Sequence, residues 1–194
     1  MANAAQPPQM GLSFEQVWAA LMENREQIRQ TEETVKKMAA QVDRVTANVG
    51  GLNRSMGELI ETLIAARLWE KFDGYPYNLK RAYQRMPVYD ETNRIRTDID
   101  ILLANGEYVM AVEVKASLHR KDDVDDHLKR MELILKYPPD QCKDKKLLGA
   151  LAGGVVDPAI EEYAHSAGFF VLELTGESVH LVKPPAGFTP RQWE

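Results

Sequence analysis

The sequence predicts a mixed α/β domain preceded by a long coiled-coil helix. Three observations predict this fold class: a seven-residue apolar repeat near the N-terminus, two apolar runs flanking Asn105-Gly106, and alternating helix and strand patterns after them. The expected organisation is a disordered N-terminus over residues 1–10, a coiled-coil helix over 11–50, the α/β domain over 51–183 and a C-terminal tail over 184–194.

The apolar repeat has the spacing of the a and d positions of a coiled coil. A strict seven-residue stripe drifts by about 20° per heptad on an ordinary helix, so it favours self-association. β-branched residues at a favour a parallel dimer or trimer through residues 11–56. The alternative is one amphipathic helix folded back on its own domain. The a series is Phe14, Leu21, Ile28, Val35, Val42, Val49 and Met56, and the d series is Val17, Asn24, Thr31, Met38, Val45 and Leu52.

After this repeat, local signals predict the order helix, three strands, helix, strand, helix, strand. Gly50-Gly51 is expected to break or hinge the long helix, because each glycine costs about 1 kcal/mol in a helix interior. Ser55 and Glu58 have the spacing of a capping box that opens a new helix. The expected elements are Ser55–Phe72 (helix), Asn78–Tyr89, Arg94–Leu103 and Tyr108–Ser117 (strands), Asp122–Tyr137 (helix), Lys146–Val156 (strand), Pro158–Ala167 (helix) and Phe169–Thr175 (strand).

The two strands around Asn105-Gly106 bring charged residues together. A two-residue Asn-Gly turn predicts that Ala104 pairs with Glu107, which fixes the register of the hairpin. Because side chains alternate between faces along a strand, this register places four charged residues on one face, within one or two residue pairs. They are Asp98, Asp100, Glu113 and Lys115.

Three carboxylates on one sheet face need compensation, because like charges opposite one another destabilise a sheet. A divalent cation is one solution, since Mg²⁺ is usually held by one or two carboxylates with water and phosphate. The alternative is a solvated face whose acids pair with Arg96 and Lys115. The nearly continuous apolar runs in both strands favour the first solution, because charges inside a covered sheet are seldom left without a partner.

These motifs resemble those of a known family. The run Thr97-Asp98-Ile99-Asp100-Ile101-Leu102, followed by Asn105-Gly106 and Val112-Glu113-Val114-Lys115, is similar to the PD-(D/E)XK nuclease superfamily. The run is also similar to small bacterial endonuclease-like proteins of unknown function. Many of these carry a coiled coil before the domain and open their first helix with Gly-Glu, as in Gly57-Glu58 here. The resemblance covers roughly residues 50–180 and implies a restriction-endonuclease-like αβββαβ core with a mixed sheet.

The resemblance also implies an activity and roles for site residues. The activity is metal-dependent hydrolysis of DNA phosphodiester bonds, with Mg²⁺ as cofactor and Mn²⁺ able to substitute. Asp100 and Glu113 would ligate the metal, Lys115 would act on the attacking water, and Glu58 would be the acid of the first helix near the metal. Asp98 and Glu61 are further candidate ligands, and the resemblance ranks Glu58 above Glu61.

Basic residues around the predicted site are candidate contacts to the phosphates of duplex or branched DNA. The alternative for each of them is a solvated rim. They are Lys80, Arg81, Arg85, Arg94, Arg96, Arg120 and Lys121.

Composition restricts the function further. The net charge of −5 argues against a partner held by bulk positive charge. Residues 1–54 hold 6 basic and 6 acidic side chains, so the predicted domain carries the whole excess of acid, and DNA binding is expected to need the metal. The single cysteine, Cys142, and the absence of any long apolar run or secretory signal favour the cytoplasm and no membrane association. A second class remains open, a coiled-coil scaffold or nucleic-acid-binding module without turnover.

Overall fold

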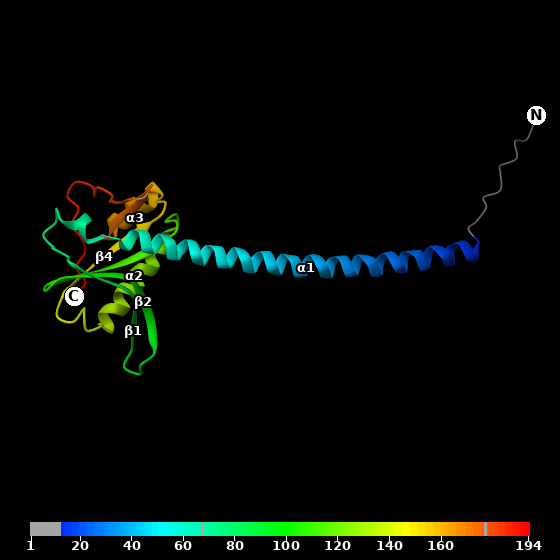
Figure 1. The fold of residues 1–194 in the computed structure, drawn as a ribbon, viewed down its shortest axis with the longest axis horizontal. Helices are drawn as coiled ribbons and strands as arrows, with labels where there is room; N and C mark the ends of the chain where they lie inside the picture. The colour runs from blue at the N-terminus through cyan, green and yellow to red at the C-terminus, as the bar shows by residue number, and fades with distance from the viewer. Residues whose placement is uncertain (1–12, 67, 177) are drawn as a thin grey trace, which may run out of the picture. The chain divides into compact units, whose positions relative to one another are not determined.

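The computed structural model describes residues 13–66, 68–176 and 178–194. The chain divides into two compact units, Met1–Leu52 and Asn53–Glu194 (Figure 1). The disorder predicted for residues 1–10 lies outside the described residues. No helix in the described ranges combines the length and apolar character needed to cross a membrane.

Helix α1 spans Phe14–Ala65 and is one continuous element. Ser13 and Gln16 cap its start, since each backbone N–H donates to the side-chain oxygen of the other residue (3.0 and 3.3 Å). The helix passes through Gly50-Gly51 and Ser55, so the predicted break and the predicted new start at Ser55 were wrong. Two glycines cost about 2 kcal/mol in a helix interior, which a helix of 52 residues tolerates when its other residues are good helix formers.

The unit Asn53–Glu194 is built on a six-stranded sheet in the order β1-β2-β3-β4-β5-β6. The pairs β3–β4 and β4–β5 are parallel and the other three are antiparallel, so the sheet is mixed, as predicted. The predicted helix and strand order is confirmed, and β6 is an addition that the sequence did not predict. The strands are β1 (Arg81–Tyr89), β2 (Ile95–Ala104), β3 (Tyr108–Lys115), β4 (Lys146–Gly153), β5 (Phe170–Thr175) and β6 (Ser178–Leu181).

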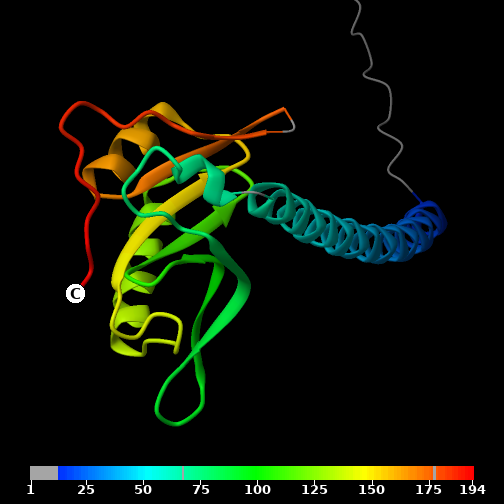
Figure 2. The same cartoon turned by 60° about the vertical axis from the view of Figure 1, so that its left-hand side comes forward.

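Helical layers cover both faces of the sheet (Figure 2). Helices α2 (Lys121–Lys136) and α3 (Pro158–Ser166) bury Val124, Met131 and Ile160 against one face. The last turns of α1 and the 3₁₀ helix η1 (Leu68–Phe72) bury Ile64 and Phe72 against the other. The middle strands are therefore apolar on both sides, as parallel strands in covered sheets usually are.

The segment 184–194, predicted as a tail, packs on this core. The Trp193 side chain is 4% exposed and its ring stacks on Phe169 at 5.2 Å between centroids. The backbone N–H of Trp193 donates to the carbonyl of Leu147 at 2.9 Å. Burial of the large apolar surface of the indole stabilises this position of the chain end relative to a solvent-exposed tail.

The β2–β3 hairpin has a register that differs from the prediction. Ala104 pairs with Val109 rather than with Glu107, and the turn residues are Gly106 and Glu107. The Asn105 side chain explains this shift, because its Oδ1 accepts the backbone N–H of Glu107 (2.7 Å) and its Nδ2 donates to the carbonyl of Tyr77. The amide of Asn105 thus holds the first corner of the turn, a common alternative for asparagine.

The alternation of faces along β2 is interrupted at Asp100, which the sequence did not predict. Ile99 and Leu102 pack in the cluster under α2 and α3, whereas Ile101 packs in the cluster on the opposite face. Opposite this point in β1, Arg85 has a φ of 50°, between the Gln84–Ile101 and Met86–Ile99 pairs. A positive φ is rare for a residue other than glycine, and such strain concentrates at functional sites.

Candidate functional site

Asp100 and Glu113 come from neighbouring strands and lie where those strands separate. The β2–β3 ladder ends, on the side away from the turn, with the pair of Ile101 and Val112, and each acid is the next residue beyond that pair. Beyond it, the backbone N–H of Val114 donates to Oδ2 of Asp100 at 2.7 Å, so the Asp100 carboxylate replaces a ladder partner. At Asp100 the side chains of β2 change sides, and the pairing with β3 has ended. The Asp100 side chain therefore faces the backbone of β3.

Glu113 is the buried centre of the site, and its side chain is only 4% exposed. Lys115 Nζ lies 2.7 Å from Oε1 of Glu113, and Nη1 of Arg130 on α2 lies 2.5 Å from Oε2. Both cations are about one-third exposed, at 33% and 32%. Both oxygens of a carboxylate withdrawn from water are therefore matched by a charged donor, as a buried charge requires.

Asp100 forms no ion pair with a cation in the part of the chain that the structure describes. Burial and then the neighbouring charge of Glu113 raise the pKa of Asp100 to about 6, and the Val114 N–H and the Arg130 charge only partly oppose them. Burial, the larger cause, and the Glu113 charge thus both disfavour the ionised form of Asp100, and a cation bound beside it would favour that form.

The two acids of α1 differ in their surroundings. Glu61 is 15% exposed and receives the Arg85 guanidinium, with Nη2 to Oε2 at 3.2 Å, whereas Glu58 is 54% exposed and lies 3.9 Å from the same nitrogen. The charge of Glu61, and not that of Glu58, is among the causes that raise the pKa of Asp100. The structure therefore places Glu61 rather than Glu58 in the electrostatic environment of Asp100.

The carboxylates are compensated mainly by side chains of the protein. Lys115 and Arg130 match Glu113, and Arg85 matches Glu61. Asp98 is exposed opposite Pro87, and no hydrogen bond or ion pair joins it to the other acids within the described residues. The pairing with Arg96 that the alternative interpretation required is not made either, because Arg96 lies 3.8 Å from Asp90.

No three His, Cys, Asp or Glu side chains in the described ranges are grouped so that they could hold a metal by themselves. Mg²⁺ does not require such a group, because one or two carboxylates, water and substrate phosphate usually complete its coordination. Asp100 and Glu113 provide two carboxylates of hard oxygen donors, and no ion pair neutralises Asp100 within the described residues, so the donor set fits a Mg²⁺ ion bound in this manner.

The predicted phosphate-binding residues are dispersed, and several are paired. Lys80 lies 2.9 Å from Asp73 and Arg120 lies 3.0 Å from Asp123, while Lys121 lies over the Tyr163 ring at 5.1 Å. Arg94 lies in the turn between β1 and β2, which Figure 2 shows in green at one end of the sheet. Arg81, at the start of β1, is exposed.

The sequence did not predict Arg130 as a site residue. A signal was present, since Asp123, His127 and Arg130 share one stripe of α2 with the buried Ile134, where an apolar face was expected. His127 is also buried, its ring 4.8 Å from that of Phe169. Burial, and then the Arg130 charge, lower the pKa of His127 to about 3, so its ring is neutral beneath the site.

Comparison with known proteins gives only distant matches. No protein-family model matches the sequence, and no curated protein matches it significantly. Among solved structures, the chain is similar to a repair endonuclease from Pyrococcus abyssi with 12% identity, a TM-score of 0.39, and coverage of 64% of this chain and 45% of the other. An EndoMS-dsDNA2 complex matches with 14% identity, a TM-score of 0.33, and coverage of 62% and 44%. The chain thus matches less than half the length of either structure, and TM-scores this low do not establish a shared fold.

Proposed function

We propose that the protein is a Mg²⁺-dependent nuclease that hydrolyses phosphodiester bonds of DNA. The observation that supports this proposal most directly is the convergence of Asp100 and Glu113 from adjacent strands, with Lys115 Nζ 2.7 Å from Glu113. The resemblance of these residues and their spacing to the PD-(D/E)XK superfamily assigns the same three side chains to metal binding and water activation.

Each side chain has a distinct role in this proposal. Asp100 and Glu113 hold the ion, which lowers the pKa of water and neutralises charge on the phosphate. Lys115 donates hydrogen bonds from its ammonium group to the attacking water and to Glu113, and so orients the water toward phosphorus. Glu61 carries a supporting negative charge, and Glu58 lies further from Asp100.

The first prediction concerns activity. Purified protein is expected to cleave at least one DNA among duplex, junction, flap and single-stranded substrates with Mg²⁺ or Mn²⁺, and EDTA is expected to stop the reaction, because the ion supplies most of the charge stabilisation. Gel electrophoresis of end-labelled substrates, with an RNA in parallel, measures this. The absence of cleavage of every substrate by folded protein would support the alternative function, a nucleic-acid-binding module or scaffold.

A specific observation favours that alternative as the second candidate. Lys115 and Arg130 already satisfy both oxygens of Glu113 without a metal. A protein that only binds DNA needs no more than this arrangement for a stable fold. Isothermal titration with Mn²⁺ separates the two functions, because a scaffold of this kind would bind no metal at millimolar concentration.

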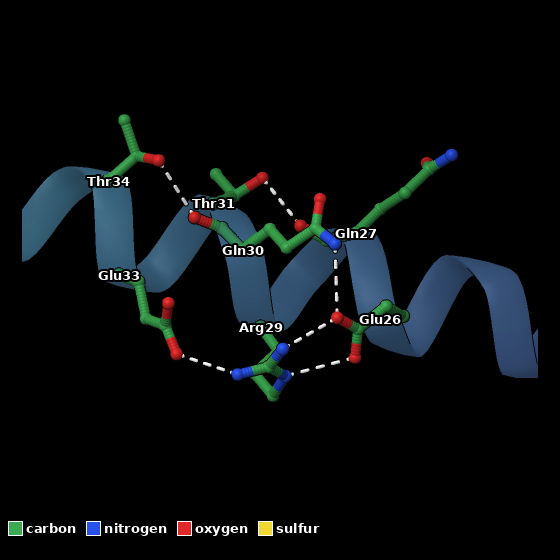
Figure 3. Close-up of polar contacts among 7 residues, drawn as sticks. All are labelled: Glu26, Gln27, Arg29, Gln30, Thr31, Glu33 and Thr34. Atoms are coloured by element: carbon green, nitrogen blue, oxygen red, sulfur yellow. Dashed lines mark hydrogen bonds and ion pairs between the residues drawn. The ribbon is translucent and has the colours of Figure 1, made fainter.

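We further propose that α1 self-associates through its heptad positions. In the unit Met1–Leu52, the a and d side chains Ile28, Val35, Met38 and Val42 are each about 60% exposed along an unpartnered stripe. Figure 3 shows how the polar residues nearby are satisfied within the helix: Arg29 bonds Glu26 and Glu33, and the Thr31 hydroxyl donates to the carbonyl of Gln27 (2.7 Å). Thr31 at d thus needs no polar partner, and a second copy of the same helix offers the matching 3.5-residue period.

The second prediction tests this association. The protein is expected to sediment as a dimer or trimer at tens of micromolar, because burying the stripe removes apolar surface from water. The double substitution Val35→Lys and Val42→Lys is expected to give a monomer, since it places like charges in the seam. The matched control is Ala40→Lys with Ala47→Lys, which adds the same charge at f positions and is expected to preserve the oligomer. A monomeric wild-type protein would contradict the proposal.

A further inference from the structure

Arg130 reaches the site from a different element than the other charged residues. It belongs to α2, and the contact joins residues 17 positions apart in the chain. Its Nη1 contacts Oε2 of Glu113 at 2.5 Å, a shorter distance than in the Lys115–Glu113 and Arg85–Glu61 ion pairs. Because Glu113 is 4% exposed, this contact brings a second positive charge, beside that of Lys115, against a buried carboxylate.

The same oxygen is one of the ligands that the proposed metal would use. Glu113 has two oxygens, and Lys115 occupies Oε1 while Arg130 occupies Oε2. A divalent cation and a guanidinium repel each other, so both cannot share Oε2 at close range without cost. The proposed function requires Lys115 to stay beside the attacking water. A metal that binds Glu113 would therefore displace Arg130 from Oε2.

A displaced Arg130 has both the reach and the chemistry to bind an anion. Its side chain is 32% exposed, so the guanidinium is not enclosed by the core. A guanidinium can pair with a phosphate in the same bidentate geometry that it uses with a carboxylate. The Arg130 side chain can therefore bind either partner with the same N–H donors. On α2, the exposed Asp126 is already paired with Lys129 at 2.8 Å. Among the described residues, the structure shows no ion pair of Arg130 other than the one with Glu113.

We propose that Arg130 is an exchangeable cation of the active site: it neutralises Glu113 in the metal-free protein, yields Oε2 of Glu113 to a divalent cation, and then binds a phosphate of the DNA substrate. This rests on the proposed function and adds to it a substrate-binding residue. It also explains why a charged residue occupies the inner stripe of α2 beside Ile134, where an apolar side chain would pack more favourably.

The third prediction compares two neighbouring cations on α2. Arg130→Gln removes the charge but keeps a donor for Glu113, and Lys129→Gln makes the same charge change on a side chain that is 71% exposed. Calorimetry without DNA is expected to show Mn²⁺ binding to Arg130→Gln about tenfold more tightly than to wild type, because a competing positive charge has been removed. Lys129→Gln is expected to leave Mn²⁺ affinity unchanged.

DNA binding in Ca²⁺, which supports binding in place of Mg²⁺, is expected to change in the opposite direction. Arg130→Gln should weaken it, and the slope of log affinity against log salt should fall by about 1, the loss of one phosphate contact. Tighter metal binding together with weaker DNA binding is a combination that a structural role for Arg130 does not produce. Unchanged or weaker Mn²⁺ binding, or unchanged DNA binding, in folded Arg130→Gln would overturn the exchange.

A measurement on wild-type protein guards against misfolding of the variant. The Nε–Hε signal of Arg130 in a ¹⁵N spectrum, assigned by its loss in Arg130→Lys, is expected to shift when Mg²⁺ is added and again when DNA is added. A signal that stays fixed at saturating Mg²⁺ contradicts the exchange even if the protein cleaves DNA, so the inference fails while the proposed function stands. If wild-type protein binds no Mg²⁺ or Mn²⁺ at all, the proposed function and the exchange fail together.

Discussion

Asp100→Asn is expected to abolish metal-dependent DNA cleavage and, at the same time, to stabilise the fold above pH 6. Activity falls because a neutral amide is a poor ligand for Mg²⁺, and the loss should be on the order of 10³-fold or more. Stability rises because the folded protein no longer holds an ionised carboxylate beside Glu113. The amide oxygen of asparagine can still accept the N–H of Val114, so the local backbone is retained.

The gain in stability follows from the direction of the pKa shift. The pKa of Asp100 rises from 3.8 to about 6 on folding, chiefly by burial. Below about pH 4 the carboxyl is protonated in both states and costs nothing. Between about pH 4 and pH 6 the carboxyl is ionised in the unfolded chain but still protonated in the folded protein, so the stability of wild type falls by about 2 to 3 kcal/mol across this interval and is not lowered further above it. The variant avoids this loss.

Thermal unfolding without metal tests this prediction. The melting temperature of Asp100→Asn should exceed that of wild type by roughly 5 °C at pH 8, and the difference should vanish near pH 4. Asp98→Asn on the same strand is the matched control for stability, because Asp98 is exposed, and its melting temperature should follow wild type. A variant less stable than wild type at pH 8 would show that Asp100 is favourably ionised in the fold.

Lys115→Ala is expected to lower the cleavage rate by about 10³-fold while leaving the fold nearly unchanged. The ammonium group is the only side-chain donor proposed to orient the attacking water, and removing one such group typically costs this much. The effect on stability is expected to be about 1 to 3 kcal/mol, since Oε1 of the buried Glu113 loses its donor while Oε2 keeps Arg130.

Single-turnover cleavage at saturating Mn²⁺ measures this effect, with melting temperature and DNA affinity in Ca²⁺ as companion readouts. Lys143→Ala is the control, because Lys143 is 58% exposed and its ion pair is with the exposed Asp140. Cleavage by Lys115→Ala at the wild-type rate would mean that the activity comes from a contaminant or from another site. Loss of cleavage together with unfolding would instead identify Lys115 as a residue needed for the fold.

Local patterns in the sequence were enough to predict the order of elements after the long helix. Strands β2 and β3 are adjacent in the chain and joined by a tight turn, so Asp100, Glu113 and Lys115 were predicted to lie together even though the predicted turn was displaced by one residue. A displacement of this kind shifts the partner of each residue by two positions and so preserves the relative faces of the paired residues from Ile101 to Ala104, whereas the change of face at Asp100 was not predicted. The predicted helix break at Gly50-Gly51 failed because propensity is a weak local term within a long helix.

Only the tertiary structure decided which charges meet in the site. The contact of Arg130 with Glu113 joins α2 to β3, and the contact of Arg85 with Glu61 joins residues 24 positions apart. No periodicity encodes such pairs, because they depend on how helices pack across a sheet. The sequence by itself determined that acids and a lysine occupy adjacent strands of a covered sheet. Folding determined that Arg130 pairs with Glu113 and that Arg85 pairs with Glu61 on α1. A buried carboxylate needs a charged partner, and the packing of the elements decides which cation lies within reach.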